Sequence, residues 1–316
     1  MNFIIIIKEA IRFGAVFLYG STGETIVEKS GHLNLGIPGI MCLGGVGGCM
    51  GAYWAFNGGA SAFWVVLTAI LMAMVFGGAG GLLYGLFTIT LRCNQNVTGL
   101  TLTTFGAGVL GFWGTQMGDK EISFASASVF AFWSPAKADT NWFSEIFLSH
   151  GPLVYVSIAI AIVVAVYIKF TRNGLALRAV GENPAAADAA GINVIAHKYA
   201  SCVLGAAIAG IGGAFYLLDC TQGSLEYVID AMGWLAVALV IFSLWRPGIG
   251  IFGSFIFGFL YILPQYIQGV ALAEKELLKV IPYAATALVL IIISFFNKRE
   301  TQPPTALGLP YFREDR

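Results

Sequence analysis

Apolar runs of about 20 residues recur along the whole chain, and this repetition limits the fold more than any other feature. A helical run of that length spans the hydrocarbon core of a bilayer, so the pattern predicts an all-α, polytopic transmembrane bundle. Of the 316 residues, 58% are hydrophobic and 11% are charged, and the mean hydropathy is +0.80. A soluble domain of this length could not bury so much apolar surface. We therefore expect residues 1–316 to form a single transmembrane domain.

Hydropathy predicts eight or nine spans, whose ends are uncertain by several residues. The candidate segments are 10–28, 33–56, 61–91, 97–117, 150–170, 197–218, 228–245, 249–268 and 279–297. The first is the weakest, because Lys8, Glu9 and Arg12 interrupt its start. Residues 1–12 are therefore also interpreted as a separate amphipathic helix at the membrane surface.

Positive charge predicts the orientation of these spans. If residues 171–196 are cytoplasmic, ten Lys and Arg residues lie inside and four lie outside, leaving aside three whose side depends on the first span. The inside set is Arg92, Lys169, Arg172, Arg178, Lys198, Arg246, Lys298, Arg299, Arg313 and Arg316, and the outside set is Lys120, Lys137, Lys275 and Lys279. Cytoplasmic loops are enriched in such residues, so this orientation is preferred. It makes 171–196 a cytoplasmic loop and 118–149 an external one.

Two glycine-rich segments of similar composition suggest an internal repeat. They are FGGAGGLLYGLF at 76–87 and GAAIAGIGGAFYLL at 205–218. The predicted topology runs them in opposite directions across the membrane, which is typical of the inverted repeats in many transporters. Glycine-rich packing helices also resemble one another without common origin, so both interpretations stay open.

A polar segment within the cytoplasmic loop has the signals of a short, capped helix. Asn183 is a suitable N-cap, and Pro184 fits the first helical position because its missing N–H is not needed there. The alanines that follow favour a helix, and Gly191 is placed to end it. We expect a helix of about two turns that stands outside the bilayer and can contact a soluble partner.

The chain lacks the sequence signals of its own energy source or of an enzyme. It has no GxxxxGK[ST] phosphate loop and no HExxH or GxSxG motif. The five cysteines have no metal-binding spacing, and His32, His150 and His197 lie at predicted span ends, where we interpret them as interfacial. Trp113, Trp234 and Trp245 are interpreted in the same way, as anchors. The formal net charge of zero gives no indication of a nucleic-acid partner.

Three segments resemble one family of membrane proteins. LRAVGENPAAADAAGINV (177–194), followed by KYASCVLGAAIAGIGGAFY (198–216), looks like the coupling region of ABC importer permeases of the branched-chain amino acid, ribose and nucleoside class. GETIVEKSGHLNLGIPGIMCLGG (23–45) and DAMGWLAVALVIFSLWRPGIGIFGSFIFG (230–258) resemble the opening and late motifs of its nucleoside and simple-sugar branch. The three segments lie in the order of the family and span most of the chain.

The resemblance implies roles for residues of the cytoplasmic loop. It makes Pro184 to Gly191 a coupling helix that inserts into a groove of a separate ATPase, and it makes Arg178 and Glu182 flanking charges that pair with that ATPase. The implied coupling residues are Arg178, Glu182, Asn183, Pro184, Ala186, Ala187, Asp188 and Gly191. The alternative is an ordinary solvated loop.

Polar and aromatic residues near two predicted spans are candidates for the substrate pathway. They are Asn34, Asn94, Asn96, Thr98, Thr101, Thr104 and Phe105. A nucleoside needs amide or hydroxyl partners for its base and ribose, and an aromatic face for stacking. Packing between helices explains the threonines equally well.

The resemblance also implies how the protein works and with what. The chain would be a permease subunit in the bacterial cytoplasmic membrane that moves nucleosides or a related small polar solute inward. It would bind no cofactor itself, since ATP and magnesium would be held by the partner ATPase. A second, longer permease subunit and an external substrate-binding lipoprotein would complete the importer. The alternatives are a permease for simple sugars or branched-chain amino acids, a stand-alone secondary transporter, and a membrane-embedded enzyme.

Overall fold

The computed structural model describes residues 3–117, 142–225, 229–267, 269, 272–296 and 302–312, and these are helical without any β-strand. The predicted all-α class is therefore confirmed. The elements are α1 (Phe3–Lys29), α2 (Ile37–Asn57), α3 (Ala62–Gly85), η1 (Leu86–Thr90), α4 (Gln95–Met117), α6 (Trp142–Phe147), α7 (Pro152–Phe170), α8 (Arg172–Glu182), α9 (Pro184–Ala189), α10 (Val194–Phe215), η2 (Tyr216–Cys220), α11 (Asp230–Phe242), α12 (Pro247–Tyr266), α13 (Leu272–Leu278) and α14 (Ile281–Phe296).

Each predicted span coincides with a helix, but not every helix has the length and composition of a membrane span. Five segments do: Ile37–Asn57, Ala62–Thr90, Pro152–Phe170, Val194–Cys220 and Pro247–Tyr266. α11 and α14 contribute shorter apolar stretches, Met232–Phe242 and Ile281–Ile292. α1 and α4 are long enough, with 27 and 23 residues, but carry more polar side chains. Several apolar helices thus support a multi-pass membrane protein.

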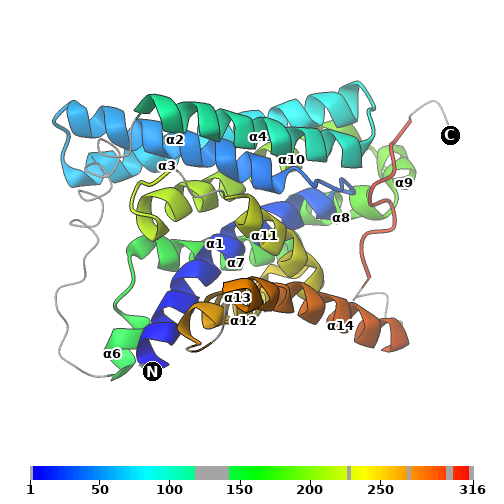
Figure 1. Cartoon of the computed structure of the whole chain (residues 1–316). Helices are drawn as coiled ribbons and strands as arrows, with labels where there is room; N and C mark the ends of the chain where they lie inside the picture. The colour runs from blue at the N-terminus through cyan, green and yellow to red at the C-terminus, as the bar shows by residue number, and fades with distance from the viewer. Residues whose placement is uncertain are drawn as a thin grey trace.

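The helices are arranged in two layers that meet at α1 and α10. α2 packs on α3, α10 and α4, whereas α1 packs on α12, α10, α11 and α7. In Figure 1 the first group lies above the second, and α1 crosses the molecule diagonally between them. α8, α9 and the C-terminal segment lie at one end of the molecule, and the start of α1 and α6 lie at the other. Residues 118–141 of the predicted external loop lie outside the described residues.

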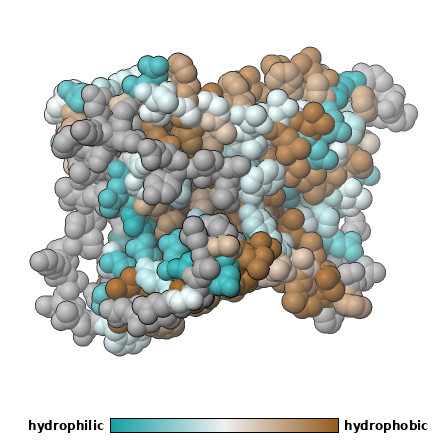
Figure 2. Space-filling view, viewed as in Figure 1, coloured by the Kyte–Doolittle hydropathy of each residue, from teal (hydrophilic) through white to brown (hydrophobic). Residues whose placement is uncertain are grey.

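Apolar side chains are exposed on the surface of several helices. Large apolar residues of α3, α4, α7 and α14 are more than one-third exposed, among them Val75, Phe105 and Phe170. Figure 2 shows brown, apolar side chains over the upper layer and around α14 at the lower right, with teal, polar side chains between and below them. Soluble monomers rarely expose apolar patches of such extent, whereas a surface that contacts lipid or another subunit requires them.

The first helix occupies the centre of the fold, although its sequence is the least apolar of the predicted spans. α1 is continuous from Phe3, and Ile6, Ala10 and Ile11 are buried. The interpretation of its first residues as a separate surface helix is therefore wrong for the described part. The charge of Arg12 is neutralised by Asp219 of η2, 3.1 Å away. A hydropathy window cannot detect an ion pair between residues so distant in sequence.

The other end of α1 is fixed by a hydrogen bond to a tryptophan. Nε1 of Trp245 donates to Oε2 of Glu28, and both side chains are buried. Trp245 lies in the turn between α11 and α12, where it and Leu244 adopt left-handed backbone angles, with φ of 55° and 57°. The interpretation of Trp245 as an interfacial anchor is thus wrong, because its indole is 6% exposed and faces α1.

We expect Trp245→Phe to lower the free energy of unfolding by about 1–3 kcal/mol, because it leaves a buried carboxylate without its donor. Trp54→Phe is the matched control, since Trp54 is 55% exposed and should tolerate the change. Thermal unfolding of both variants in detergent micelles measures the difference. Equal melting temperatures would show that Glu28 does not depend on the indole.

The two glycine-rich segments end in the same local geometry. α3 continues into η1 and α10 into η2, each a π-helical turn of five residues. After each turn, a non-glycine residue adopts a left-handed conformation, Arg92 with φ 56° and Gln222 with φ 55°, and Gly223 (φ 83°) follows Gln222. α3 and α10 also pack directly on each other. The likeness between segments 76–87 and 205–218 therefore extends from composition to backbone geometry.

Candidate functional site

The short helix predicted in the polar loop is present as α9, and its start is capped as expected. Asn183 has extended backbone angles, and its Oδ1 accepts a hydrogen bond from the N–H of Ala186 at 3.0 Å. Pro184 occupies the first helical position. The side-chain oxygen of Asn183 thus satisfies one of the N–H groups that lack partners at a helix start.

Gly191 ends α9 in the conformation that glycine favours. Its φ is +84°, in the left-handed region. Its N–H donates to the carbonyl of Asp188 at 3.0 Å, and the N–H of Ile192 donates to the carbonyl of Ala187 at 3.0 Å. This pair of bonds is the Schellman motif, which closes the C-terminal end of a helix. The predicted stop at Gly191 is confirmed.

One side of α9 is buried and the other is open. Ala187 is 3% exposed and packs with Val180 of α8 and Val194 of α10. Ala186 and Gly191 are exposed, and a Cβ added to Gly191 would meet no atom within 4 Å. The open face therefore carries only small side chains, which allows a partner surface to approach the backbone closely.

Removing the cap of α9 should loosen this helix without unfolding the protein. We expect Asn183→Ala to cost about 1 kcal/mol locally, since it deletes the acceptor for Ala186. Amide hydrogens in segment 184–191 should then exchange about fivefold faster in hydrogen–deuterium exchange, because 1.4 kcal/mol corresponds to a factor of ten. Asn183→Ser keeps an acceptor and serves as the control. Unchanged exchange in the alanine variant would contradict the role of the cap.

The eight predicted coupling residues lie together on α8, α9 and the turn that follows, at one end of the molecule (Figure 1). Oε2 of Glu182 accepts a hydrogen bond from Oγ1 of Thr305 at 2.8 Å. Glu182 attracts Lys29 at the end of α1, whereas the partly buried Arg178 carries the same charge as Lys29 and repels it. Glu182, rather than Arg178, thus ties α8 to the body of the protein.

The C-terminal segment 302–312 ties α8 and α9 to the link between α1 and α2. The N–H of Ala306 donates to the carbonyl of Gly181 at 3.0 Å, and the N–H of Gly308 donates to the carbonyl of Gly31 at 3.1 Å. Further along, the hydroxyl of Tyr311 donates to Oδ2 of Asp188 at 2.8 Å. These hydrogen bonds of the C-terminal segment therefore restrain the position of α9.

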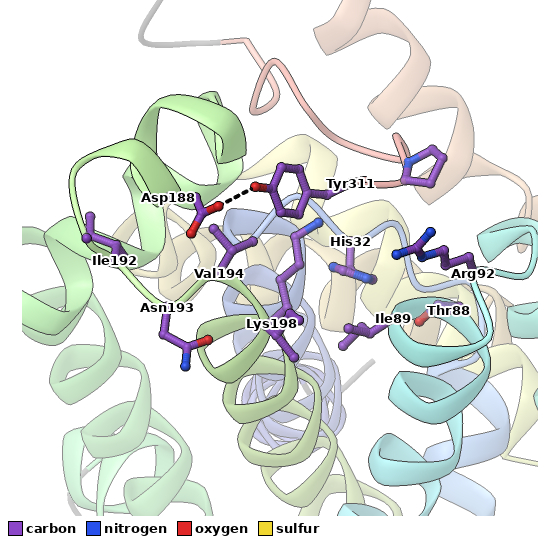
Figure 3. Close-up of a pocket in the computed structure, with 13 residues that line it drawn as sticks. His32, Thr88, Ile89, Arg92, Asp188, Ile192, Asn193, Val194, Lys198 and Tyr311 are labelled. Carbon is purple, nitrogen blue, oxygen red and sulfur yellow. Dashed lines mark hydrogen bonds between the residues drawn. The ribbon is translucent and has the colours of Figure 1, made fainter. Parts of the chain in front are cut away.

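A cavity of about 440 Å³ lies beneath this segment. Figure 3 shows its walls, to which the α1–α2 link, the end of η1, the start of α10 and the C-terminal segment all contribute. The lining residues are His32, Thr88, Ile89, Arg92, Asp188, Gly191, Ile192, Asn193, Val194, Ile195, Lys198, Pro310 and Tyr311. The cavity thus adjoins α9 directly.

His32 lies deep in this wall, and its interpretation as an interfacial residue is wrong. It is 2% exposed, and its Nδ1 has no hydrogen-bond partner among the described residues. Burial, and then the charge of Lys198, lower the pKa of His32 to about 3, so the imidazole is neutral at physiological pH.

Six of the seven predicted pathway residues lie on or just before α4, and most of them face outward. Thr98, Thr101, Thr104 and Phe105 lie on the helix itself, with Phe105 52% exposed. The opposite face of α4 packs on α2. Asn94 and Asn96 at its start are also exposed. The three threonine hydroxyls donate to carbonyls one turn earlier, at 2.8–3.2 Å, which leaves their lone pairs available as acceptors.

Asn34, the seventh, lies elsewhere. It is 1% exposed, its Oδ1 accepts from the N–H of Gly36 at 2.9 Å, and its own N–H donates to Oε1 of Glu24 at 3.1 Å. These bonds fix the link between α1 and α2. Asn34 therefore does not share a surface with the α4 residues in this structure.

Most residues that surround the cavity carry no functional signal in the sequence. Lys198 is notable there only for its charge, His32 lies at a span end and Tyr311 lies in no motif, whereas Asp188 and Gly191 are predicted, but for coupling. No local signal could have found them, because the cavity forms where segments near residues 30, 90, 195 and 310 meet.

Comparison with known proteins identifies a matching family and several relatives of this chain. A family model described as "Branched-chain amino acid transport system / permease component" matches residues 6–294. The nucleoside ABC transporter permease protein NupC of Lactococcus lactis is 29% identical over 318 residues, which cover 98% of this chain and 97% of NupC. The guanosine ABC transporter permease protein NupQ of Bacillus subtilis is 28% identical over 327 residues, 99% of this chain and 98% of NupQ.

A third relative, TsgC13 of Haloferax volcanii, is named as a permease of a glucose ABC transporter. It is 29% identical over 273 residues, which cover 85% of this chain and 79% of TsgC13. No solved structure matches this chain.

Proposed function

Because the chain belongs to the family of permease components of branched-chain amino acid transport systems, we propose that it forms the membrane path of an ABC importer for nucleosides. Membership in this family makes it a transport subunit rather than an enzyme. The observation that carries the choice of substrate is the near full-length similarity to two permeases named for nucleosides and for guanosine.

A simple sugar is the second candidate substrate, and the similarity to TsgC13 favours it. A nucleoside contains a ribose, so either substrate requires groups that bind hydroxyls. Only the nucleoside has a base, for which the site also needs an aromatic face. The exposed ring of Phe105 beside Thr101 and Thr104 supports the nucleoside. The family match disfavours a stand-alone secondary transporter, although Glu24 and Glu28 are buried and Oε2 of Glu24 has no hydrogen-bond partner among the described residues.

We infer that α9 docks on a separate ATPase, which would hold ATP and magnesium, while this chain binds no cofactor. The support is physical: a capped helix, exposed small residues along it, and a position on the side that the Lys and Arg distribution makes cytoplasmic. Arg178 and Glu182 would flank the contact. The family itself implies an associated ATPase.

A second permease subunit would cover the outward face of α4. Thr101, Thr104, Gly108, Gly111 and Thr115 are exposed and repeat at intervals of three and four residues, so they form one stripe along the helix. Small residues allow another helix to approach closely, and threonine hydroxyls remain available to a polar solute. Asn94, Asn96, Thr98 and Phe105 would line the same path, and Asn34 would act behind it by fixing the α1–α2 link.

The proposed topology has nine crossings, with the N-terminus outside. The pair between Arg12 and Asp219 puts the start of α1 beside the end of η2, which the charge distribution makes external. An external lipoprotein would deliver the solute to this side of the bacterial cytoplasmic membrane. The matched π-helical ends of α3 and α10 support an inverted repeat related by an axis in the membrane plane.

Transport by the reconstituted complex tests this proposal. The chain would be purified with the ATPase, second permease and lipoprotein encoded beside it, and placed in proteoliposomes. We expect ATP-dependent uptake of radiolabelled guanosine that exceeds uptake of ribose, glucose or leucine. Preference for glucose would select the sugar alternative, and solute uptake without ATP would overturn the ABC assignment.

A threonine variant tests the path itself. Thr104→Val should raise the KM for guanosine by about tenfold, since it removes one hydroxyl partner. Thr68→Val on α3 is the control, because it deletes a hydroxyl away from the α4 face. Equal KM values for the two variants would remove Thr104 from the path.

A further inference from the structure

We propose that the cavity beneath the C-terminal segment binds the phosphate group of a small ligand on the cytoplasmic side, apart from the transport path. Lys198, Arg92 and His32 would hold the phosphate. The same chemistry is offered by an anionic phospholipid headgroup and by a soluble phosphate compound. The site is separate from the α4 face, and the proposal does not depend on which solute is transported.

The strongest observation is a buried lysine at the wall of an open cavity. Lys198 is 3% exposed and lines the cavity. The ion pairs in the described part of the chain join Arg12 to Glu9 and Asp219, and none of them includes Lys198. Removing an ammonium group from water is unfavourable unless an anion compensates its charge. The neighbouring cavity has room for that anion.

The side chains of His32 and Arg92 border the same cavity as Lys198. Figure 3 shows the side chains of Lys198, His32 and Arg92 turned toward the region below the C-terminal segment, from α10, the α1–α2 link and the end of η1. Nδ1 of His32 is fully buried and has no partner among the described residues. The Arg92 guanidinium lies 4.7 Å from the ring centre of Phe312, which holds it at the rim. A neutral imidazole and two cations together offer several hydrogen-bond donors.

The charge balance of the wall favours an anion. Among its lining residues Arg92 and Lys198 are positive, Asp188 is negative, and His32 is neutral. The one lining carboxylate accepts a hydrogen bond from the hydroxyl of Tyr311 at 2.8 Å, and the ion pairs among the described residues do not join it to Lys198. Phosphate, with its several acceptor oxygens, suits such a set of donors better than a single carboxylate.

The size and position of the cavity agree with a phosphate ester. Its volume of about 440 Å³ lies within the range of small-molecule sites. It adjoins the start of α10, a helix that has the length and composition of a membrane span, on the side predicted to be cytoplasmic. Basic pockets between helices on that side of a membrane commonly receive lipid headgroups.

Binding to the full-length protein in nanodiscs tests the proposal in two arms. In the first, the protein is placed in phosphatidylcholine discs with or without phosphatidylglycerol, and retained lipid is measured by native mass spectrometry. In the second, glycerol 3-phosphate and inorganic phosphate are titrated into the protein in neutral discs, and thermal unfolding is followed. We expect saturable binding in at least one arm, and the arm identifies the source of the phosphate.

Matched variants locate the site. Lys198→Met keeps the aliphatic stem and should weaken binding at least about tenfold, whereas Lys198→Arg should retain most of it. Lys169→Met changes an exposed lysine at the end of α7 and should bind like the parent. If Lys198→Met does not fold, Arg92→Gln at the rim provides the same comparison. The proposal is overturned if neither arm saturates, or if the variants at 198 and 92 bind as tightly as Lys169→Met.

Discussion

Ala186→Arg is expected to lower solute-stimulated ATP hydrolysis and uptake strongly while leaving the permease folded. Ala186 is exposed on α9, so a longer side chain can extend into solvent in the isolated subunit. In the proposed complex the same position faces a groove of the ATPase, where an unpaired guanidinium would lose its hydration and keep the helix out of the groove. We expect the affinity between the two subunits, and the coupled rate, to fall at least about tenfold.

Three measurements separate this outcome from a folding defect. The parent, Ala186→Arg and Ala186→Ser would be compared for thermal unfolding, for co-purification with the ATPase, and for ATP hydrolysis with guanosine present. Serine is nearly as small as alanine and should behave like the parent. If Ala186→Arg binds the ATPase and supports hydrolysis as well as Ala186→Ser does, α9 is not the docking element.

Gly44→Ala is expected to destabilise the protein strongly, even though it adds a single methyl group. An added Cβ at Gly44 in α2 would fall well inside van der Waals contact with the Cα, C and O atoms of Gly210 in α10. Backbone atoms cannot rotate away as the end of a side chain can, so the two helices would have to separate. We expect a loss of about 3 kcal/mol, at the upper end for an overpacked core.

Gly248→Ala is the matched control for this change. It lies in the first turn of α12, where an added Cβ meets no atom within 4 Å, and alanine favours a helix more than glycine does. Thermal unfolding and the fraction of monodisperse protein in size-exclusion chromatography give the comparison. If the two alanine variants melt at the same temperature, α2 and α10 do not approach as closely as the structure has them.

Local features of the sequence predicted local structure well. The caps of α9 depend on residues within eight positions of one another, so Asn183, Pro184 and Gly191 were sufficient to define that helix. The apolar runs likewise located the membrane helices, because hydropathy over about 20 residues is itself the cause of insertion. The family resemblance rested on the same segments.

Features that depend on distant contacts were not predictable from the sequence. Trp245 and His32 look interfacial in the sequence because each lies at the end of an apolar run. In the structure the Trp245 indole bonds to Glu28 of α1 and the His32 ring packs on Tyr84 of α3, and both side chains are buried. Asn34 looked like a ligand-binding amide, and its bonds to Gly36 and Glu24 became apparent only in three dimensions.

The central position of α1 constrains how the protein is made. Arg12 has a local partner in Glu9, but its pair with Asp219 and the bond of Glu28 to Trp245 join residues 207 and 217 positions apart, so these two contacts are absent when the first helix leaves the ribosome. A translocon that releases segments into lipid according to hydropathy would not release this one alone. We therefore expect stable insertion of α1 to depend on synthesis of η2 and the α11–α12 turn, which would make biogenesis of the subunit cooperative rather than helix by helix.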